Sequence, residues 1–344
     1  MLQSAMGFEG YAVKSAEDLV SGNPLSAEHP PKSMPVYKNT ISYIEQSADR
    51  PAKKSAAQLE KEVTDIAALL GIKEYTITHQ ADNAGIESEA ALQAALAKNA
   101  AKGFPLDIAI FGTNECTLES ADYSIRHSSL DSAVTVQLKA PHSLPSGMDF
   151  TPYAPPESLL QCAEYLAKAY AHILPKNAVP CAEGGAYQMT EPPSRAFALL
   201  FYANGGEEAW RNYCFRTIRF VPNESGALAF IRFDITDLTQ KLGDYPLISA
   251  GEALTLLSEG HYSTDAPAAF MGAASVQKVE LVYRADTRDE VLLPYYRFYC
   301  ALPQEHPVAQ FSQSKGLTLL GTYYVPAVEP QYLTALPVNN GSVN

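Results

Sequence analysis

The expected fold is decided by Val276-Gln277-Lys278-Val279-Glu280-Leu281-Val282-Tyr283-Arg284, by Pro294-Tyr295-Tyr296-Arg297-Phe298-Tyr299, and by Gly321-Thr322-Tyr323-Tyr324-Val325-Pro326-Ala327-Val328. In the first segment Val279, Leu281 and Tyr283 alternate with charged residues, a pattern typical of a half-buried antiparallel strand. The other two segments are crowded with tyrosine, which is enriched in strands. We therefore predict strands 276–284, 291–302 and 318–325 in one antiparallel sheet.

The rest of the chain repeats a plan in which one helix is followed by strands. Capping-box patterns at Ser55/Gln58 and Ser249/Glu252 predict helices that end at Gly71 and Gly260. A helix between Pro155-Pro156 and Pro175, an alanine-rich helix at 88–100 and a hairpin turn at 222–226 are also expected. The remaining predicted strands are 75–78, 107–112, 133–138, 196–202, 214–221 and 227–233.

Runs of strands separated by single helices predict an α+β fold, with antiparallel sheets each packed with one or two helices. The length of 344 residues favours two domains. We expect an N-terminal linker or arm (1–35), an N-terminal α+β domain (36–240), a C-terminal helix-plus-sheet domain (241–337) and a tail (338–344).

Composition limits the classes of partner. The chain carries 25 basic and 38 acidic side chains, which give a formal charge of −13. This balance argues against nucleic acid and against anionic membranes as partners. No apolar run is long enough to span a bilayer, and no signal peptide is recognisable at the start. A cytoplasmic protein and the soluble remainder of an exported one both fit.

Chemical motifs are scarce. The five cysteines are widely spaced; Cys162 and Cys181 could form a bridge, but an odd count leaves at least one free thiol. The seven histidines have no partner at helical spacing, so we expect no metal and no cofactor. Glycine-rich phosphate loops and the nucleophile elbow are absent, and the two S-x-x-K spacings lack companion motifs. We therefore expect no enzyme and assign no catalytic residue.

The tyrosines remain as candidate binding residues. Consecutive residues of a strand point to opposite faces, so one ring of each tyrosine pair should pack inward and the other could be exposed beside the arginines. Cross-strand pairing that stabilises the sheet and a recognition face for a peptide, glycan or partner protein are both open readings. The candidate binding residues are Tyr283, Arg284, Tyr295, Tyr296, Arg297, Tyr299, Tyr323 and Tyr324.

The three segments quoted first, together with Met34-Pro35-Val36-Tyr37-Lys38-Asn39 and Gly243-Asp244-Tyr245-Pro246, resemble uncharacterised lipoproteins of clostridial gut bacteria. The resemblance implies a cell-envelope protein whose signal peptide and lipidated cysteine precede the present chain. Membrane attachment would then occur only through that lipid anchor. The C-terminal helix and strands are also similar in pattern to the YycI and YycH regulators of a cell-wall sensor kinase and, more loosely, to PepSY modules, which are non-catalytic.

The leading hypothesis is a non-enzymatic, extracytoplasmic binding or regulatory protein of the Gram-positive cell envelope that acts through its tyrosine-rich C-terminal sheet. One alternative is an envelope hydrolase with Asp234, Asp237 and Glu252 in an interdomain cleft. Another is a structural protein that pairs through a sheet edge.

Overall fold

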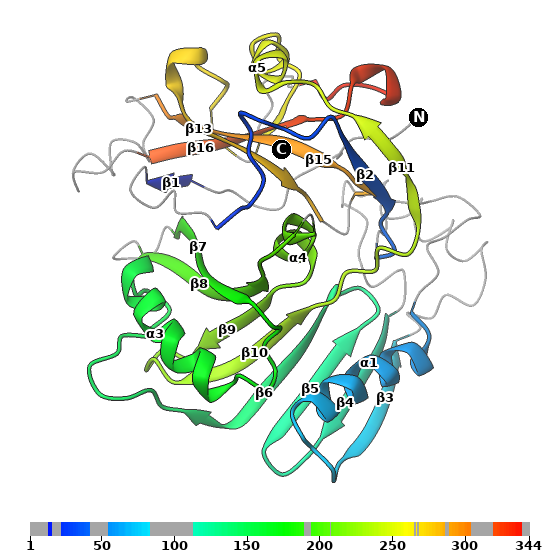
Figure 1. Cartoon of the computed structure of the whole chain (residues 1–344), viewed down its shortest axis with the longest axis vertical. Helices are drawn as coiled ribbons and strands as arrows, with labels where there is room; N and C mark the ends of the chain where they lie inside the picture. Colours follow the sequence, from blue (N-terminus) through cyan, green and yellow to red (C-terminus); the bar gives the residue numbers. More distant parts are fainter. Residues whose placement is uncertain are drawn as a thin grey trace, which may run out of the picture.

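The computed structural model of the chain describes residues 13–15, 22–41, 54–82, 113–188, 194–206, 208–264, 266, 268–285, 289–303 and 319–338. These residues form four α-helices and two antiparallel sheets, so the predicted α+β class is confirmed (Figure 1). The helices are α1 Ala56–Leu69, α3 Pro156–Ala169, α4 Ala209–Phe215 and α5 Ala250–Ser258.

Strands from both ends of the chain build the larger sheet. Its order is β13-β15-β16-β1-β7-β8-β9-β10-β6-β5-β4-β3, and β12 pairs with β16; the smaller sheet has the order β11-β2-β14. The bounds are β1 Val13–Ser15, β2 Ser33–Lys38, β3 Thr76–Asp82, β4 Thr113–Glu119, β5 Tyr123–Ser128, β6 Ala133–His142, β7 Ala178–Gln188, β8 Ser194–Ala203, β9 Ile218–Pro222, β10 Leu228–Asp234, β11 Lys241–Pro246, β12 Ser263–Thr264, β13 Val276–Tyr283, β14 Val291–Leu292, β15 Pro294–Ala301 and β16 Leu319–Pro326.

Local sequence signals explain three of the helices. In α1 and α5 the side chains of the cap residues Ser55 and Ser249 each accept a hydrogen bond from the backbone N–H of the third helical residue. The side chain of that third residue accepts a hydrogen bond from the backbone N–H of the cap. The buried faces of α1 and α3 keep helical spacing and pack on strands of the larger sheet. These helices and the hairpin turn before Ala227 are confirmed, with Gly226 in a positive-φ conformation that the turn requires.

One predicted strand is partly wrong. Residues 214–221 were expected to be extended, but α4 continues through Phe215 and only β9 is a strand. The Phe215 ring packs edge-on against Tyr37 and Tyr283, at centroid distances of 6.4 and 5.0 Å. This long-range burial overrides the local preference for strand. The predicted helix 88–100 and strand 107–112 lie outside the described residues.

The predicted strand 291–302 is divided between the two sheets. Residues Val291–Leu292 form β14 and pair with β2 of the smaller sheet, whereas β15 starts at Pro294 between β13 and β16. Sequence patterning did not indicate this division, because aromatic and apolar residues predominate on both sides of it.

Two parts of the range 1–35, which was expected to be a linker or arm, belong to the sheets or to a hydrophobic cluster. Val13–Ser15 is inserted as β1 between β16 and β7, and it thereby joins the upper and lower parts of the larger sheet in Figure 1. Ser33 already belongs to β2, and Ala27 is buried in a hydrophobic cluster. The backbone of β1 pairs with hydrogen-bonding groups of both neighbouring strands. Backbone pairing does not depend on a pattern of side chains, so the sequence did not indicate this strand.

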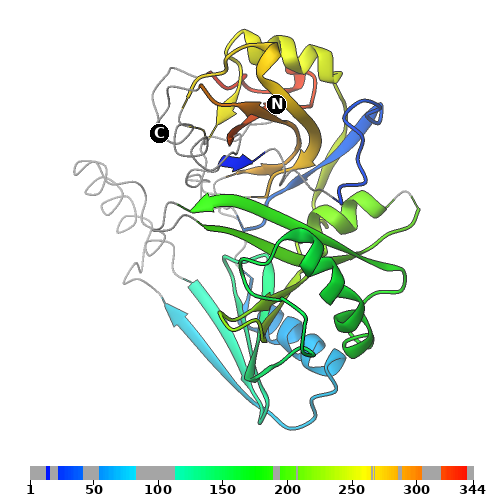
Figure 2. The same cartoon turned by 90° about the vertical axis from the view of Figure 1, so that its left-hand side faces the viewer.

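Two main hydrophobic clusters lie in different parts of the molecule. The first is built by α1, α3 and the strands from β4 to β10, drawn below in Figures 1 and 2. The second is built by α5 with β13, β15 and β16, drawn above, and includes Ala27 and Met34. Because one sheet runs through both parts, the division into two domains at residue 240 stays a prediction.

Candidate functional site

The predicted tyrosine face is for the most part interior. Both members of the pair Tyr295 and Tyr296 are buried, at 2% and 0% exposure, and so are Tyr299 and Tyr323. One ring of each pair was expected to pack inward, and the other could have been exposed; in Tyr295–Tyr296 neither ring is exposed. Helix α5 and its cluster cover one face of this sheet, while a cluster that includes Val36 packs on the other. A strand covered on both faces has no solvent side.

The tyrosine hydroxyls serve the fold. Those of Tyr283, Tyr296 and Tyr323 donate to the backbone carbonyls of Pro35, Ile248 and Ala268, at 2.6, 2.8 and 2.8 Å. A buried phenol needs such a partner, and these bonds hold β2 and two connecting segments against the larger sheet. Tyr324 is half-buried and packs edge-on against Tyr295. These contacts favour the reading in which the aromatic side chains stabilise the sheet.

The arginines of the predicted face are held in ion pairs. Arg297 lies opposite Glu280 across β15 and β13, its Nε donates to Glu280 Oε2 at 3.1 Å, and Lys278 Nζ lies 2.8 Å from Glu280 Oε1. Burial alone would raise the pKa of the Glu280 carboxyl, but the charges and hydrogen bonds of Arg297 and Lys278 lower this pKa to about 2. Arg284, also half-buried, pairs with the buried Asp289 at 3.2 Å.

The three carboxylates of the hydrolase alternative serve separate structural purposes. Asp234 accepts hydrogen bonds from Thr217 and from Arg219. Glu252 caps its own helix, α5, which lies at the far end of the molecule from β10 in both overall views (Figures 1 and 2). Asp237 lines a pocket whose lining includes neither Asp234 nor Glu252. Asp234, Asp237 and Glu252 therefore do not assemble into one carboxylate cleft.

The pocket that Asp237 lines is a candidate site. Its volume is about 480 Å³, within the range of small-molecule sites. Its walls come from segments far apart in the sequence: the end of β2, the middle of α1, α4 and the residue after it, and the connection from β10 to β11 with the first residue of β11. The lining residues are Tyr37, Glu62, Arg211, Arg216, Ile235, Thr236, Asp237, Leu238, Thr239 and Lys241.

Three of the five charged side chains in this pocket have ion-pair partners. Arg211 pairs with Glu208, Lys241 pairs with Asp244 at 2.8 Å, and Glu62 pairs with Lys54. None of these partners lines the pocket. The ion-pair partners therefore balance the charges of Arg211, Lys241 and Glu62 from outside the pocket, while these three side chains still form part of its wall.

The other two charged side chains are Arg216 and Asp237. Within the described part of the chain no ion pair reaches either of them, and none joins them to each other. Arg216 is exposed. One carboxylate oxygen of Asp237 accepts bonds from the backbone N–H and the hydroxyl of Thr239, at 2.9 and 2.7 Å. These bonds hold the carboxylate in place without neutralising it.

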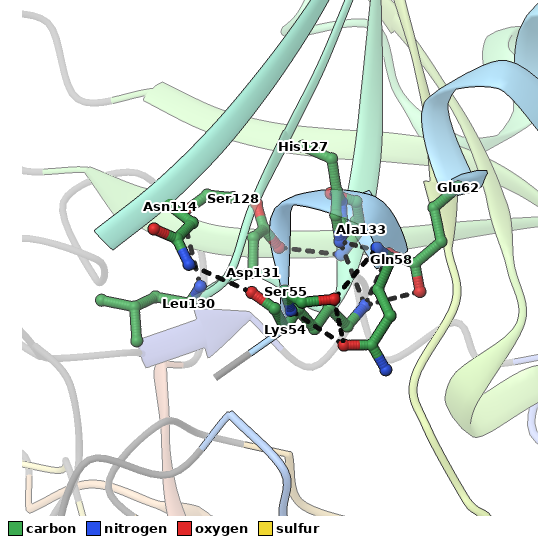
Figure 3. Close-up of polar contacts among 10 residues, drawn as sticks. All are labelled: Lys54, Ser55, Gln58, Glu62, Asn114, His127, Ser128, Leu130, Asp131 and Ala133. Atoms are coloured by element: carbon green, nitrogen blue, oxygen red, sulfur yellow. Dashed lines mark hydrogen bonds and ion pairs between the residues drawn. The ribbon is translucent and has the colours of Figure 1, made fainter. Parts of the chain in front are cut away.

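At the Glu62 wall lies a polar triad of Lys54, Glu62 and His127, of which His127 is buried and the other two are half-buried (Figure 3). The His127 side chain is 0% exposed, and its Nε2 lies 3.0 Å from both Glu62 Oε2 and Lys54 Nζ. Lys54 Nζ also lies 3.0 Å from both carboxylate oxygens of Glu62. Each member of the triad therefore contacts the other two.

The triad fixes the orientation of His127 and the charge of Glu62. His127 Nδ1 lies 2.9 Å from the Ala133 carbonyl, which can only accept, so Nδ1 carries a proton. Burial would raise the pKa of Glu62, but hydrogen bonds and charges of His127 and Lys54 lower it. Glu62 thus stays ionised at the pocket wall.

Sequence reasoning missed both the pocket and the triad. Lys54 and His127 are 73 positions apart, and only the packing of α1 on β4 and β5 brings them together. The capping box at Ser55 was the one local signal near the triad, because it fixes where α1 begins.

The structure shows the state of the five cysteines and the distribution of side chains that could bind a metal ion. All five cysteines are free thiols, so the bridge considered between Cys162 and Cys181 is not formed. Burial raises the pKa of both of these thiols. Among the described residues no three His, Cys, Asp or Glu side chains gather as a metal site would require.

The chain matches no protein-family model, and no curated protein sequence is significantly similar to it. The resemblance to clostridial lipoproteins, to the YycI and YycH regulators and to PepSY modules therefore stays a prediction. Within the described ranges, no helix has the length and apolar character needed to cross a bilayer.

Proposed function

We propose that this protein is a non-enzymatic binding protein and that it holds a small anionic ligand in the pocket lined by Arg211, Arg216 and Lys241. The observation that carries the proposal is the convergence of these three cationic side chains on one pocket of about 480 Å³ in a chain of net charge −13. Cationic groups outnumber the two carboxylates of the lining, Glu62 and Asp237, and this excess provides a local attraction for an anion.

Arg216 is the expected anchor for the anion. Its guanidinium is exposed and has no ion-pair partner among the described residues, so no existing interaction must be broken when a ligand arrives. A guanidinium presents donors in a planar fork that matches carboxylate and phosphate oxygens. Tyr37, Ile235 and Leu238 add apolar surface to the same walls. Such a mixture of apolar walls and a few polar groups is typical of binding pockets.

Binding fits this site better than hydrolysis. Glu62, the lining carboxylate that contacts His127, has both oxygens within 3.0 Å of Lys54 and is held ionised, which does not suit a general acid. Asp237 is the other acidic residue in the lining, and its carboxylate is engaged by Thr239 in a local turn.

An extracytoplasmic location in the Gram-positive cell envelope remains part of the proposal and rests on the family resemblance alone. Fractionation of cells that produce the native protein, with protease treatment of intact cells, tests this part separately. Recovery of the protein only in the cytosolic fraction, protected from protease, would remove the envelope assignment and leave the binding proposal in place.

Isothermal titration with N-acetylglycine and with inorganic phosphate tests the binding proposal. We expect at least one of these anions to bind, and Arg216→Gln to weaken its affinity by about tenfold or more, since a hydrogen bond to a charged group contributes about 1.5–3 kcal/mol. Arg126→Gln is the matched control, because Arg126 is an exposed arginine of β5 that does not line the pocket. Equal affinity for the wild type and Arg216→Gln would contradict the proposal.

A further inference from the structure

We propose that the ligand of this pocket is zwitterionic, a free amino acid or short peptide whose carboxylate is bound by Arg216 and whose ammonium group is bound by Asp237. This inference rests on the proposed function and specifies its ligand class. It follows from which charges in the lining are already balanced within the protein and which are not.

The charge balance of the lining selects these two residues. Arg211, Lys241 and Glu62 each have an ion-pair partner behind the wall. Arg216 and Asp237 have none within the described residues, and no ion pair connects them. The pocket therefore presents one unbalanced positive group and one unbalanced negative group. A ligand with a carboxylate and an ammonium group satisfies both, whereas a simple anion satisfies only Arg216.

The local structure presents the Asp237 carboxylate in a fixed orientation. Thr239 donates its backbone N–H and its hydroxyl to Asp237 Oδ1, which leaves Oδ2 without a hydrogen bond from the described residues. A carboxylate oxygen has acceptor capacity for an ammonium group. The turn also limits the rotamers of Asp237, so little side-chain entropy is lost when an ammonium group binds.

The same turn allows a charge change without a structural change. In Asp237→Asn the amide oxygen can take over both bonds from Thr239, so the turn is preserved while the negative charge is removed. Asp149 supplies a matched control, because its Oδ1 accepts the backbone N–H and hydroxyl of Thr151 in the same arrangement. Asp149 does not line the pocket. Asp149→Asn therefore reproduces the chemistry of the substitution away from the site.

Isothermal titration with glycine, diglycine and triglycine tests the inference, with the N-acetylated and C-terminally amidated form of each as comparison. Each added residue lengthens the distance between the two charges by up to about 3.5 Å, so the series measures the spacing that the pocket accepts. We expect one member to bind about tenfold or more tightly than either of its blocked forms. Asp237→Asn should remove the preference over the N-acetylated form, while Asp149→Asn should keep it.

The outcomes separate this inference from the proposed function. If N-acetylglycine binds as tightly as the free compounds, or if Asp237→Asn keeps the preference for a free ammonium group, the zwitterion is refuted and anion binding stands. If Arg216→Gln weakens the free and N-acetylated forms alike while Asp237→Asn weakens only the free form, both are supported. If neither anions nor peptides bind, both are overturned.

Discussion

Substitution of Glu280 tests whether the buried ion pairs of the C-terminal sheet stabilise the fold. Glu280 is 5% exposed and contacts Arg297 and Lys278, which lower the pKa of its carboxyl from 4.5 to about 2. At about 1.4 kcal/mol for each tenfold change in proton affinity, this depression corresponds to about 3 kcal/mol of folding free energy at neutral pH.

The sign of the pH dependence follows from the depressed pKa. The contribution of Glu280 is complete above the pKa of the unfolded chain, near 4.5, and is lost as the pH falls toward about 2. Glu280→Gln removes this contribution and leaves the half-buried Arg297 beside a neutral amide. We therefore expect Glu280→Gln to lower the free energy of unfolding by about 3–5 kcal/mol at pH 7 and by much less near pH 2.

Urea denaturation of the wild type and Glu280→Gln between pH 2 and pH 7 measures the effect. Glu115→Gln is the control, because Glu115 pairs with the exposed Arg126 and should cost only about 0–1 kcal/mol. The double variant Glu280→Gln/Arg297→Met should recover stability, since it removes the uncompensated guanidinium. The reasoning is refuted if Glu280→Gln costs less than about 1 kcal/mol at pH 7, or if its cost does not shrink as the pH falls.

Two further substitutions test the packing. His127→Ala should lower the free energy of unfolding by about 2–4 kcal/mol in urea denaturation, because it removes a fully buried ring and its hydrogen bond to the Ala133 carbonyl. The control His79→Ala removes a partly exposed ring and should change the free energy of unfolding by less than about 1 kcal/mol. Equal effects of the two substitutions would contradict the structural role of the triad. Gly321→Ala should destabilise by about 1–3 kcal/mol, since its Cβ would lie 2.6 Å from Ala266 Cβ; an unchanged thermal midpoint would show that this contact relaxes freely.

The helices were predictable because their signals are local. The capping boxes at Ser55 and Ser249 and the helical spacing of apolar residues in α1 and α3 act within a few residues of the chain. The alternation in β13 likewise predicted a strand of an antiparallel sheet, and the hairpin turn before Ala227 followed from its glycine. The α+β class then follows from the order of these elements.

The sequence alone determined the caps, the helix faces and the positions of the strands β3, β6, β8, β10, β13 and β16, since each depends on neighbours along the chain. Only the tertiary structure decided that β1 joins the two parts of the sheet, that α4 extends into an expected strand and that Tyr295 and Tyr296 are both buried. It also decided that Arg216 and Asp237 share one pocket. Burial and charge pairing depend on which distant segments meet, and the spacing of residues along the chain does not encode those contacts.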